Sequence, residues 1–512
     1  MTAAPGLTLD AELADEAATA RLADQLAAML GPGDTLSLAG GLGAGKTAFA
    51  RLIIRRLARD AELEVPSPTF TLMQTYATPA FPVVHADFYR LGGDGELAEL
   101  GFEEASEGAL ALIEWASRAP AALPADHIEI EFWTDIARGD TFRRVEVRAY
   151  GAMAGRLERA MATARLLREA GWSDAVRAFM LGDASTRAYE RLTRATGETA
   201  VLMISPPRPD GPPVRGGRPY SAIARLAEDI RPFIAMDNGL RAQGFSAPRV
   251  IAHDTGAGLA VIEDLGAETF TADGAPIPER YAEAVSVLAR LHRLTLPAEL
   301  PVEPGVTHVI PPYDLDALMI EAELLPEWYA PHIARAALSG AAAASFGQRW
   351  RAALREVLDA PTTWTLRDFH SPNLIWLGHR TGQARVGLID FQDCVLGHPA
   401  YDLVSLLQDA RITVPDALEL KLLGHYAHQR RLSDPEFDMP RFARAYAILG
   451  AQRATKILGI FARLDRRDRK PHYLAHLPRI ERYLAKNLAH PALDELRDWC
   501  AEHMPRAMSA AA

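Results

Sequence analysis

Residues 34–47 read DTLSLAGGLGAGKT, in which an apolar stretch runs directly into a glycine-rich turn. Residues 35–40 are expected to form a buried strand, and KTAFARLIIRRLA (46–58) has the apolar spacing of an amphipathic helix. A strand, a glycine turn and a helix in this order are typical of a phosphate-binding loop. The stretch therefore predicts an α/β domain that binds a nucleotide at the carboxyl edge of its sheet.

The turn itself, GGLGAGKT (40–47), contains the residue types that phosphate binding needs. Glycines such as Gly43 and Gly45 let backbone N–H groups converge on phosphate oxygens, and the following helix presents its positive end to the same anion. Lys46 is placed to reach the outer phosphates of ATP, and the Thr47 hydroxyl can ligate Mg²⁺.

A phosphate-binding loop needs an acid at a nearby strand end to complete its metal site. Two candidates close apolar stretches, Asp87 in VVHADFYRL and Glu114 in ALALIEWA. Both carboxylates are therefore expected at the edge of the sheet. An ordinary cap at a strand-to-helix junction is the alternative for either residue.

The remaining pattern predicts the domain organisation. Residues 10–30 have the apolar spacing of a helix, and strand-like stretches follow the loop at 70–76, 81–88, 109–115, 127–133 and 143–150. We expect a P-loop ATPase domain over residues 1–150, a helical linker over 151–171 and a second domain over 172–512. The second domain begins with sheet-like stretches and is mostly helical after about residue 280, which is the outline of a two-lobed, kinase-like α+β fold.

A second set of polar residues lies in LRDFHSPN (366–373) and GLIDFQD (387–393). Asp368 and Asn373 are separated by four residues, and Asp390 closes an apolar strand 17 residues after Asn373. Phosphoryl transfer to a hydroxyl needs one carboxylate to orient the hydroxyl, and an amide with a second carboxylate to hold Mg²⁺ against ATP. The spacing predicts such a site; an Asn/Asp-rich hairpin is the alternative.

Composition excludes several classes of protein. The formal net charge of −11 argues against a generally basic nucleic-acid surface. The two cysteines, Cys394 and Cys500, lack the spacing of a zinc site or a disulfide framework. No stretch approaches the roughly 18 apolar residues of a membrane span, and the acidic N-terminus lacks the features of a signal peptide. We expect a cytoplasmic protein without a membrane partner.

Four motifs of the first domain resemble the TsaE family, the small ATPase of bacterial tRNA threonylcarbamoyladenosine biosynthesis. They are GGLGAGKT (40–47), PSPTFTL (66–72), HADFYRL (85–91) and LIEWASR (112–118). The resemblance covers about residues 10–150. It implies an ATPase that serves the protein complex modifying adenosine 37 of tRNA, with tRNA itself met only indirectly.

The resemblance also implies residue roles. Lys46 and Thr47 would hold ATP and Mg²⁺, and Glu114 would be a catalytic metal ligand. Asp87 would order the metal or the attacking water, and Thr69 would lie in a switch-like loop. One departure is Gly41, which stands where many members have Asp and removes a carboxylate from the loop.

Residues 172–500 resemble the aminoglycoside phosphotransferase-like kinases. Within them they are most similar to the amino-sugar kinases that phosphorylate the anomeric hydroxyl of N-acetylmuramate and N-acetylglucosamine in cell-wall recycling. The stretches 389–411, IDFQDCVLGHPAYDLVSLLQDAR, and 450–464, GAQRATKILGIFARL, carry most of this likeness. The two resemblances together imply a bifunctional fusion that binds ATP at two sites.

By this second resemblance, Asp368 would be the catalytic base, and Asn373 and Asp390 would be metal ligands. Gly182 to Ser185 would cover the ATP phosphates, and Glu263 to Leu265 would form the hinge beside adenine. Further candidates are His370 for the sugar, Asp402 as a brace of the catalytic loop, and Arg453 with Lys456 for the lactyl carboxylate of muramate. A solvated helix face is the alternative for the last pair.

Two positions depart from the kinase pattern. Leu366 stands where such kinases have His two positions before the catalytic aspartate, and Met203 stands where a strand lysine would pair the α- and β-phosphates. We expect either that an arginine, Arg187, Arg191 or Arg225, replaces that lysine, or that ATP is held more weakly. The alternatives for the second domain are a regulatory pseudokinase and an antibiotic-modifying phosphotransferase; the first domain has the alternative of a nucleotide-gated assembly switch.

Overall fold

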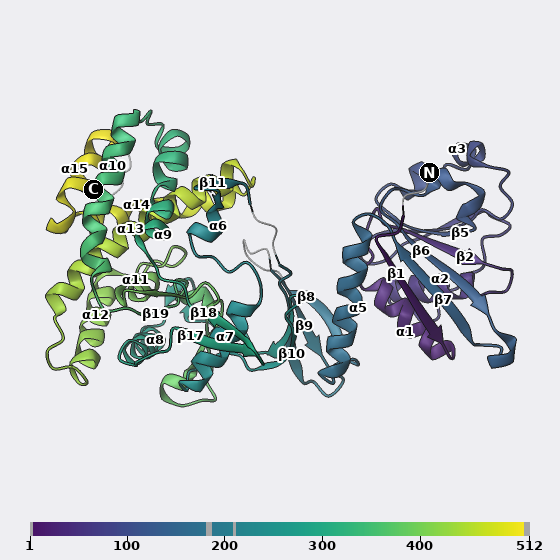
Figure 1. Ribbon diagram of the computed structural model, residues 1–512, viewed down its shortest axis with the longest axis horizontal. Helices are drawn as coiled ribbons and strands as arrows, with labels where there is room; N and C mark the ends of the chain where they lie inside the picture. Colours follow the sequence, from purple (N-terminus) through teal and green to yellow (C-terminus); the bar gives the residue numbers. More distant parts are fainter. Residues whose placement is uncertain (1–3, 181–186, 208–210, 506–512) are drawn as a thin grey trace. The chain divides into compact units, whose positions relative to one another are not determined.

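Two sheets organise the chain, one in each of the two units into which it divides, Met1–Ser173 and Asp174–Ala512. The computed structural model describes residues 4–180, 187–207 and 211–505. Each unit has a hydrophobic core of its own. Figure 1 labels the helices and strands of both units.

The first unit is built on a seven-stranded sheet in the order β1-β7-β6-β2-β5-β4-β3. Its strands are β1 (Leu7–Leu13), β2 (Thr35–Gly40), β3 (Met73–Tyr76), β4 (Val83–Asp87), β5 (Leu110–Glu114), β6 (Ile128–Thr134) and β7 (Arg143–Ala149). Strand β2 lies between β5 and β6 and runs parallel to both, and β4 runs parallel to β5. The carboxyl ends of β2, β4 and β5 therefore meet at one edge of the sheet.

Helix α2 (Lys46–Ala58) follows β2 and packs its apolar face into the core of this unit. Phe49, Ile53 and Ile54 are fully buried, and the Phe49 ring meets that of Phe132 edge to face at 5.3 Å. This packing fixes the start of α2 beside the end of β2, where the glycine turn lies. The unit also contains α1 (Glu16–Ala27), α3 (Leu97–Leu100), α4 (Phe102–Ser106) and α5 (Met153–Glu169).

The prediction of one helix over residues 10–30 is wrong at its beginning. Residues 7–13 form β1, in which inward and outward side chains alternate and which pairs antiparallel with β7. The helix α1 begins only after Asp15, whose carboxylate accepts the backbone N–H of Ala18 at 2.7 Å. Leu13 satisfies both a period of two and a helical period, so it was assigned to the wrong element.

Residues 151–171, expected as a helical linker, form α5. This helix packs against α1, β1 and β7, and Met153 and Leu157 belong to the core of the first unit. The compact first unit accordingly extends to Ser173.

The second unit begins with a five-stranded antiparallel sheet in the order β13-β14-β10-β9-β8. Its strands are β8 (Val176–Met180), β9 (Ala188–Thr193), β10 (Thr199–Ile204), β13 (Val250–Asp254) and β14 (Leu259–Glu263). Helix α7 (Arg231–Ala242) contacts β13. Together these elements form a small lobe.

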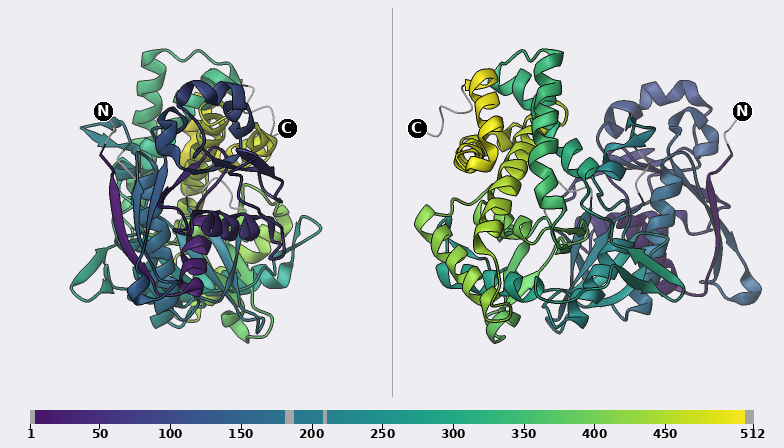
Figure 2. Two further views of the ribbon diagram at one scale, coloured as in Figure 1. Left: turned by 90° about the vertical axis from the view of Figure 1, so that its right-hand side faces the viewer. Right: turned by 60° about the vertical axis from the view of Figure 1, so that its left-hand side comes forward.

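A larger helical lobe follows, seen as the green and yellow helices in Figure 2. Its helices are α8 (Pro278–Leu291), α9 (Leu315–Ala322), α10 (Gly340–Leu358), α11 (Ala400–Leu407), α12 (Asp416–Arg431), α13 (Met439–Arg466), α14 (Leu477–Leu488) and α15 (Asp494–His503), with a π-helical segment over Leu325–Ala334. Helix α13 is central, because it contacts α9, α10, α11 and α14.

Short strands carry the polar motifs of this lobe. The pairs are β19 (Thr363–Thr365) with β22 (Val395–Gly397), and β20 (Leu374–Trp376) with β21 (Val386–Leu388). The loop after β19 and the residues after β21 therefore lie close together. Further short elements are β11 (Pro213–Arg215), β12 (Arg218–Pro219), α6 (Tyr220–Ile223), β15 (Thr271–Ala272), β16 (Ala275–Pro276), β17 (Glu299–Glu303) and β18 (Val306–Val309).

Asp237 on α7 is a fully buried acid. Burial raises the pKa of Asp237 to about 7, an effect that Arg241 and the backbone N–H of Val250 only partly offset. At pH 8 the folded chain must therefore hold a charge that water would solvate in the unfolded chain.

We predict that Asp237→Asn stabilises the second unit at high pH. Between about pH 4 and pH 7 the unfolded chain releases the proton of the Asp237 carboxyl group, while the folded chain retains it. The free energy of unfolding of the wild type therefore falls as pH rises, by up to about 1.4 kcal/mol per pH unit. The free energy of unfolding of the variant, relative to that of the wild type, should increase by about 2 kcal/mol from pH 5 to pH 8. Urea unfolding followed by hydrogen exchange in α7 measures this difference. The same difference at both pH values would contradict the prediction.

Candidate functional site

The glycine turn between β2 and α2 has the backbone of an anion site. Gly40, Gly43 and Gly45 have φ of +131°, +76° and +107°, a region that favours glycine. At Gly40 a side-chain Cβ would lie 2.5 Å from the carbonyl oxygen of Phe132, so only glycine fits there. No side chain caps the start of α2 at Gly45, and the N–H groups of its first turn are available to an anion.

Lys46 lies folded against this turn. Its Nζ donates to the carbonyl oxygens of Gly40 and Gly41, each at 2.8 Å, and sits 4.2 Å from the centre of the Trp115 ring. Burial lowers the pKa of Lys46 below its ordinary value, while Glu114 and Asp87 act in the opposite direction. The ammonium group is thereby held between the loop carbonyls and the Trp115 ring.

Asp87 and Glu114 end neighbouring parallel strands and lie opposite each other in the sheet register. The Thr47 hydroxyl donates to Glu114 Oε1 at 2.7 Å, and the same oxygen lies 2.9 Å from His85 Nε2. Asp87 Oδ2 accepts the Thr69 hydroxyl at 2.6 Å. The structure therefore brings the predicted residues of the first site together and places hydroxyl and carboxylate oxygens side by side, a donor set suited to a hard cation.

In the second unit a cleft of about 610 Å³ contains the second set of polar residues. Its walls come from the small-lobe sheet, the residues after β14, the loop after β19 and the residues after β21. The lining includes Val201, Ile262, Glu263, Asp264, Leu265, Asp368, His370, Asn373, Asp390, Asp393, Arg187 and Arg411. A cleft with an apolar floor and convergent polar groups is the usual form of a small-molecule site.

Asp368, Asn373 and Asp390 converge in this cleft. The Asn373 amide donates to Asp390 Oδ2 at 3.2 Å and to the backbone carbonyl of Asp368 at 3.0 Å. Asp390 Oδ1 accepts the Gln392 amide at 2.8 Å. Asp390 has a φ of +60°, a conformation that non-glycine residues hold mainly at functional sites.

The two acids differ in electrostatic environment. Burial would raise the pKa of Asp368, but Lys456, His370 and Arg453 together lower it below its ordinary value. Burial raises the pKa of Asp390, and the neighbouring charge of Asp368 raises it further. Asp368 is therefore the acid that stays ionised most readily and can accept a hydroxyl proton.

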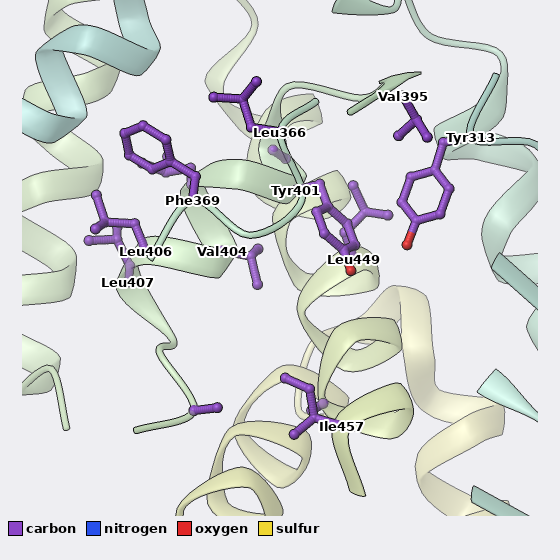
Figure 3. Close-up of a cluster of buried hydrophobic side chains, with 14 of the residues drawn as sticks. Tyr313, Leu366, Phe369, Val395, Tyr401, Val404, Leu406, Leu407, Leu449 and Ile457 are labelled. Carbon is purple, nitrogen blue, oxygen red and sulfur yellow. The ribbon is translucent and has the colours of Figure 1, made fainter. Parts of the chain in front are cut away.

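The loop after β19, which carries Asp368, is anchored by hydrogen bonds to α11. The Asp402 carboxylate accepts the backbone N–H groups of Leu366 at 2.7 Å and Arg367 at 2.8 Å. Figure 3 shows Leu366 and Phe369 on either side of this loop, above Tyr401 and Val404 of α11, and all four belong to one buried cluster. The loop is thus fixed by two hydrogen bonds and by apolar packing on both sides of Asp368.

Each of the two units matches a known protein family. Residues 176–444, more than half of the chain, match the family described as "Phosphotransferase enzyme family", and residues 13–141 match "Threonylcarbamoyl adenosine biosynthesis protein TsaE". The N-acetylmuramate/N-acetylglucosamine kinase of Caulobacter vibrioides is 41% identical over 364 residues, which are 68% of this chain and 97% of that protein. The protein of the same name from Pseudomonas putida is 31% identical over 62% of this chain and 86% of its own length.

The first unit has relatives of its own. The tRNA threonylcarbamoyladenosine biosynthesis protein TsaE of Rickettsia felis is 46% identical over 118 residues, which are 23% of this chain and 68% of that protein. The chain belongs to both families. Both resemblances seen in the sequence are thereby confirmed, and the chain is an enzyme that uses ATP.

In the phosphotransferase unit, the two basic residues expected to meet the lactyl carboxylate, Arg453 and Lys456, are buried. Lys456 Nζ forms a buried ion pair with Glu321 at 2.9 Å, and the same glutamate is bound by the guanidinium of Arg367. Lys456 and Arg453 are buried and are not among the residues that line the cleft. The sequence showed that they share a helix face, but not that the facing helix α9 supplies a buried acid.

The other predicted residues of this unit are placed as follows. Glu263 and Leu265 line the cleft, and the Glu263 carboxylate is held by Arg380 at 3.1 Å and by the backbone N–H of Arg249 at 3.0 Å. Gly182 and Ser185 lie outside the described residues. His370 lines the cleft beside Asp368 and is 7% exposed.

Sequence reasoning missed two residues of the TsaE-family unit. His85 contacts Glu114, and Trp115 covers the ammonium group of Lys46. The signal for His85 was present, because His85 and Asp87 are two residues apart on β4 and so share a face of the sheet. Trp115 gave no such signal, because it follows β5 in a left-handed conformation with a φ of +61°.

Two features are absent from the described residues. No group of three or more His, Cys, Asp or Glu side chains in this part of the chain is arranged as a metal site. Within the same residues, no helix has both the length and the apolar character that crossing a bilayer requires.

Proposed function

We propose that the chain joins two ATP-dependent activities. The first unit hydrolyses ATP in support of the protein complex that makes threonylcarbamoyladenosine at position 37 of tRNA. The second transfers the γ-phosphoryl group of ATP to the anomeric hydroxyl of N-acetylmuramate or N-acetylglucosamine. The observation that carries the proposal is that Glu114 in the first site and Asp390 in the second are each hydrogen-bonded to a neighbouring polar residue of their site. The two units that contain these sites have relatives named TsaE and N-acetylmuramate/N-acetylglucosamine kinase.

In the second unit, Asp368 orients the sugar hydroxyl and takes its proton as the oxygen attacks the γ-phosphorus of ATP. The bond between that phosphorus and the bridging oxygen breaks, and ADP leaves. The side-chain oxygens of Asn373 and Asp390 would hold Mg²⁺, which prefers oxygen ligands. When bound, Mg²⁺ supplies positive charge against the phosphoryl group being transferred.

The alternatives for this unit have less support. A pseudokinase would usually have lost Asp368 or Asp390, and both remain, hydrogen-bonded into one site. An antibiotic-modifying phosphotransferase, the second alternative, would act on a polycation. The named relatives are amino-sugar kinases.

We predict that Asp368→Asn abolishes sugar phosphorylation by the intact chain. Loss of a general base typically lowers kcat by about 10²–10⁴-fold, and the apparent KM for ATP should change little. The assay follows sugar phosphate by mass spectrometry with N-acetylmuramate, N-acetylglucosamine and kanamycin as separate substrates. The matched control is Asp434→Asn, at an exposed position of the same lobe.

Two results would reject the kinase assignment. One is wild-type activity on kanamycin with none on either amino sugar. The other is an Asp368→Asn variant as active as Asp434→Asn.

In the first unit, the site is set up for hydrolysis. Lys46 and the amide nest of the glycine turn bind the phosphates, and the oxygens of Thr47 and Glu114 fit Mg²⁺. Asp87, held by Thr69 on the 66–72 loop, is placed to order the attacking water. Leu42 of the glycine turn is 75% exposed and Phe70 of the 66–72 loop is 81% exposed, which supports docking of the protein partners here.

We predict that Glu114→Gln separates the two activities. Glutamine keeps an oxygen for the Thr47 hydroxyl but removes the negative charge, so phosphate release in the absence of sugar should fall by at least about tenfold. Sugar phosphorylation should be unchanged, because it belongs to the other unit. Glu107→Gln, an exposed position before β5, is the control. A parallel loss of both activities would show that they are not separate.

A further inference from the structure

The phosphotransferase unit lacks the lysine that such kinases use to bind the α- and β-phosphates. At the corresponding place in β10 stands Met203, which is fully buried. Val201, two residues earlier on the same face, lines the ATP cleft. Met203 therefore presents a thioether, a weak acceptor without a charge, toward the side where a phosphate-binding cation belongs.

The three arginines that can replace the lysine have different partners. Arg191 forms an ion pair with Asp264 at 3.0 Å, and Arg225 forms one with Asp314 at 2.5 Å. Neither of these arginines lines the cleft. Arg187 does, and its Nη1 lies 3.5 Å from Asp390 Oδ1. The geometry thus singles out Arg187.

The strand register explains how Arg187 reaches this position. Arg187 immediately precedes β9, whose first residue, Ala188, pairs with Ile204 of β10. Arg187 therefore stands next to the end of the strand that carries Met203. Its side chain is only 7% exposed, so the cation is enclosed in the cleft and does not extend into solvent.

We propose that Arg187 takes the place of the strand lysine and binds the α- and β-phosphates of ATP in the second site. In the structure the guanidinium of Arg187 faces Asp390, which has Asp368 as a second acidic neighbour. With ATP bound, the guanidinium would contact the phosphates, and the Asp390 carboxylate would be available to hold the metal. This inference rests on the proposed kinase function of the unit.

The chemistry of arginine suits this exchange. The guanidinium is always charged and has five N–H donors in a planar fork, so it binds two phosphate oxygens as readily as one carboxylate. Lysine in the same position would supply the charge but not the paired donors. A charged lysine should therefore recover part of the function, and an apolar side chain of similar length should recover none.

The test compares Arg187→Met, Arg187→Lys and Arg177→Met in the intact chain. Arg177 is the matched control, because it lies on β8 of the same sheet, forms an ion pair with Glu190 at 2.5 Å and does not line the cleft. With an amino sugar as acceptor, we expect Arg187→Met to raise the KM for ATP at least tenfold and to lower kcat. We expect the KM for the sugar to stay within twofold, Arg187→Lys to recover most of the ATP affinity, and Arg177→Met to match wild type.

A binding measurement keeps the inference testable without turnover. In a chain that carries Lys46→Ala to remove nucleotide from the first site, ADP binding by calorimetry should weaken at least tenfold with Arg187→Met and remain unchanged with Arg177→Met. If wild type phosphorylates no amino sugar, the proposed function fails while this measurement still decides the role of Arg187.

The inference is overturned if Arg187→Met leaves the ATP KM and the ADP affinity within twofold of the Arg177→Met control. It is also overturned if Arg187→Lys loses as much ATP affinity as Arg187→Met, because the effect would then not depend on the positive charge. An equal rise in the KM for sugar and for ATP would assign Arg187 a structural role instead.

Discussion

Both sites depend on carboxylates at the ends of buried strands, where hydrogen-bond donors must replace water. In the first unit Glu114 ends β5 and is held by the Thr47 hydroxyl and by His85. In the second unit Asp390 follows β21 and is held by Asn373 and Gln392. Each carboxylate is held in one orientation by hydrogen-bond donors from the same site. The orientation of the carboxylate therefore depends on those donor residues.

The two units supply positive charge in different ways. The first uses backbone N–H groups and a helix terminus, with Lys46 enclosed between loop carbonyls and the Trp115 ring. The second has no such nest among its described residues and relies on side chains. Glu321 neutralises Arg367 and Lys456 inside the large lobe. The arginines that line the cleft within the described ranges are Arg187 and Arg411.

The sequence predicted most of what local spacing determines. The glycine turn, the strands that end in Asp87 and Glu114, and the convergence of Asn373 with Asp390 all follow from short motifs whose neighbours are close in the chain. The sequence did not predict features that depend on residues far away in the chain. Residues 7–13 are a strand because β7 pairs with them. Lys456 is buried because α9 supplies Glu321 as its ion-pair partner. Sequence spacing also could not show which of the three arginines replaces the strand lysine, because that depends on which end of a strand faces Asp390.

The most direct test of the account is the number of nucleotides that one intact chain binds. Two structurally unrelated sites predict two molecules of ADP per chain at saturation in equilibrium titration with Mg²⁺. Removing the Lys46 side chain should leave one, because the amide nest then lacks its cation while the cleft of the second unit is untouched. A stoichiometry of one for the unaltered chain would contradict the claim that this protein has two working nucleotide sites.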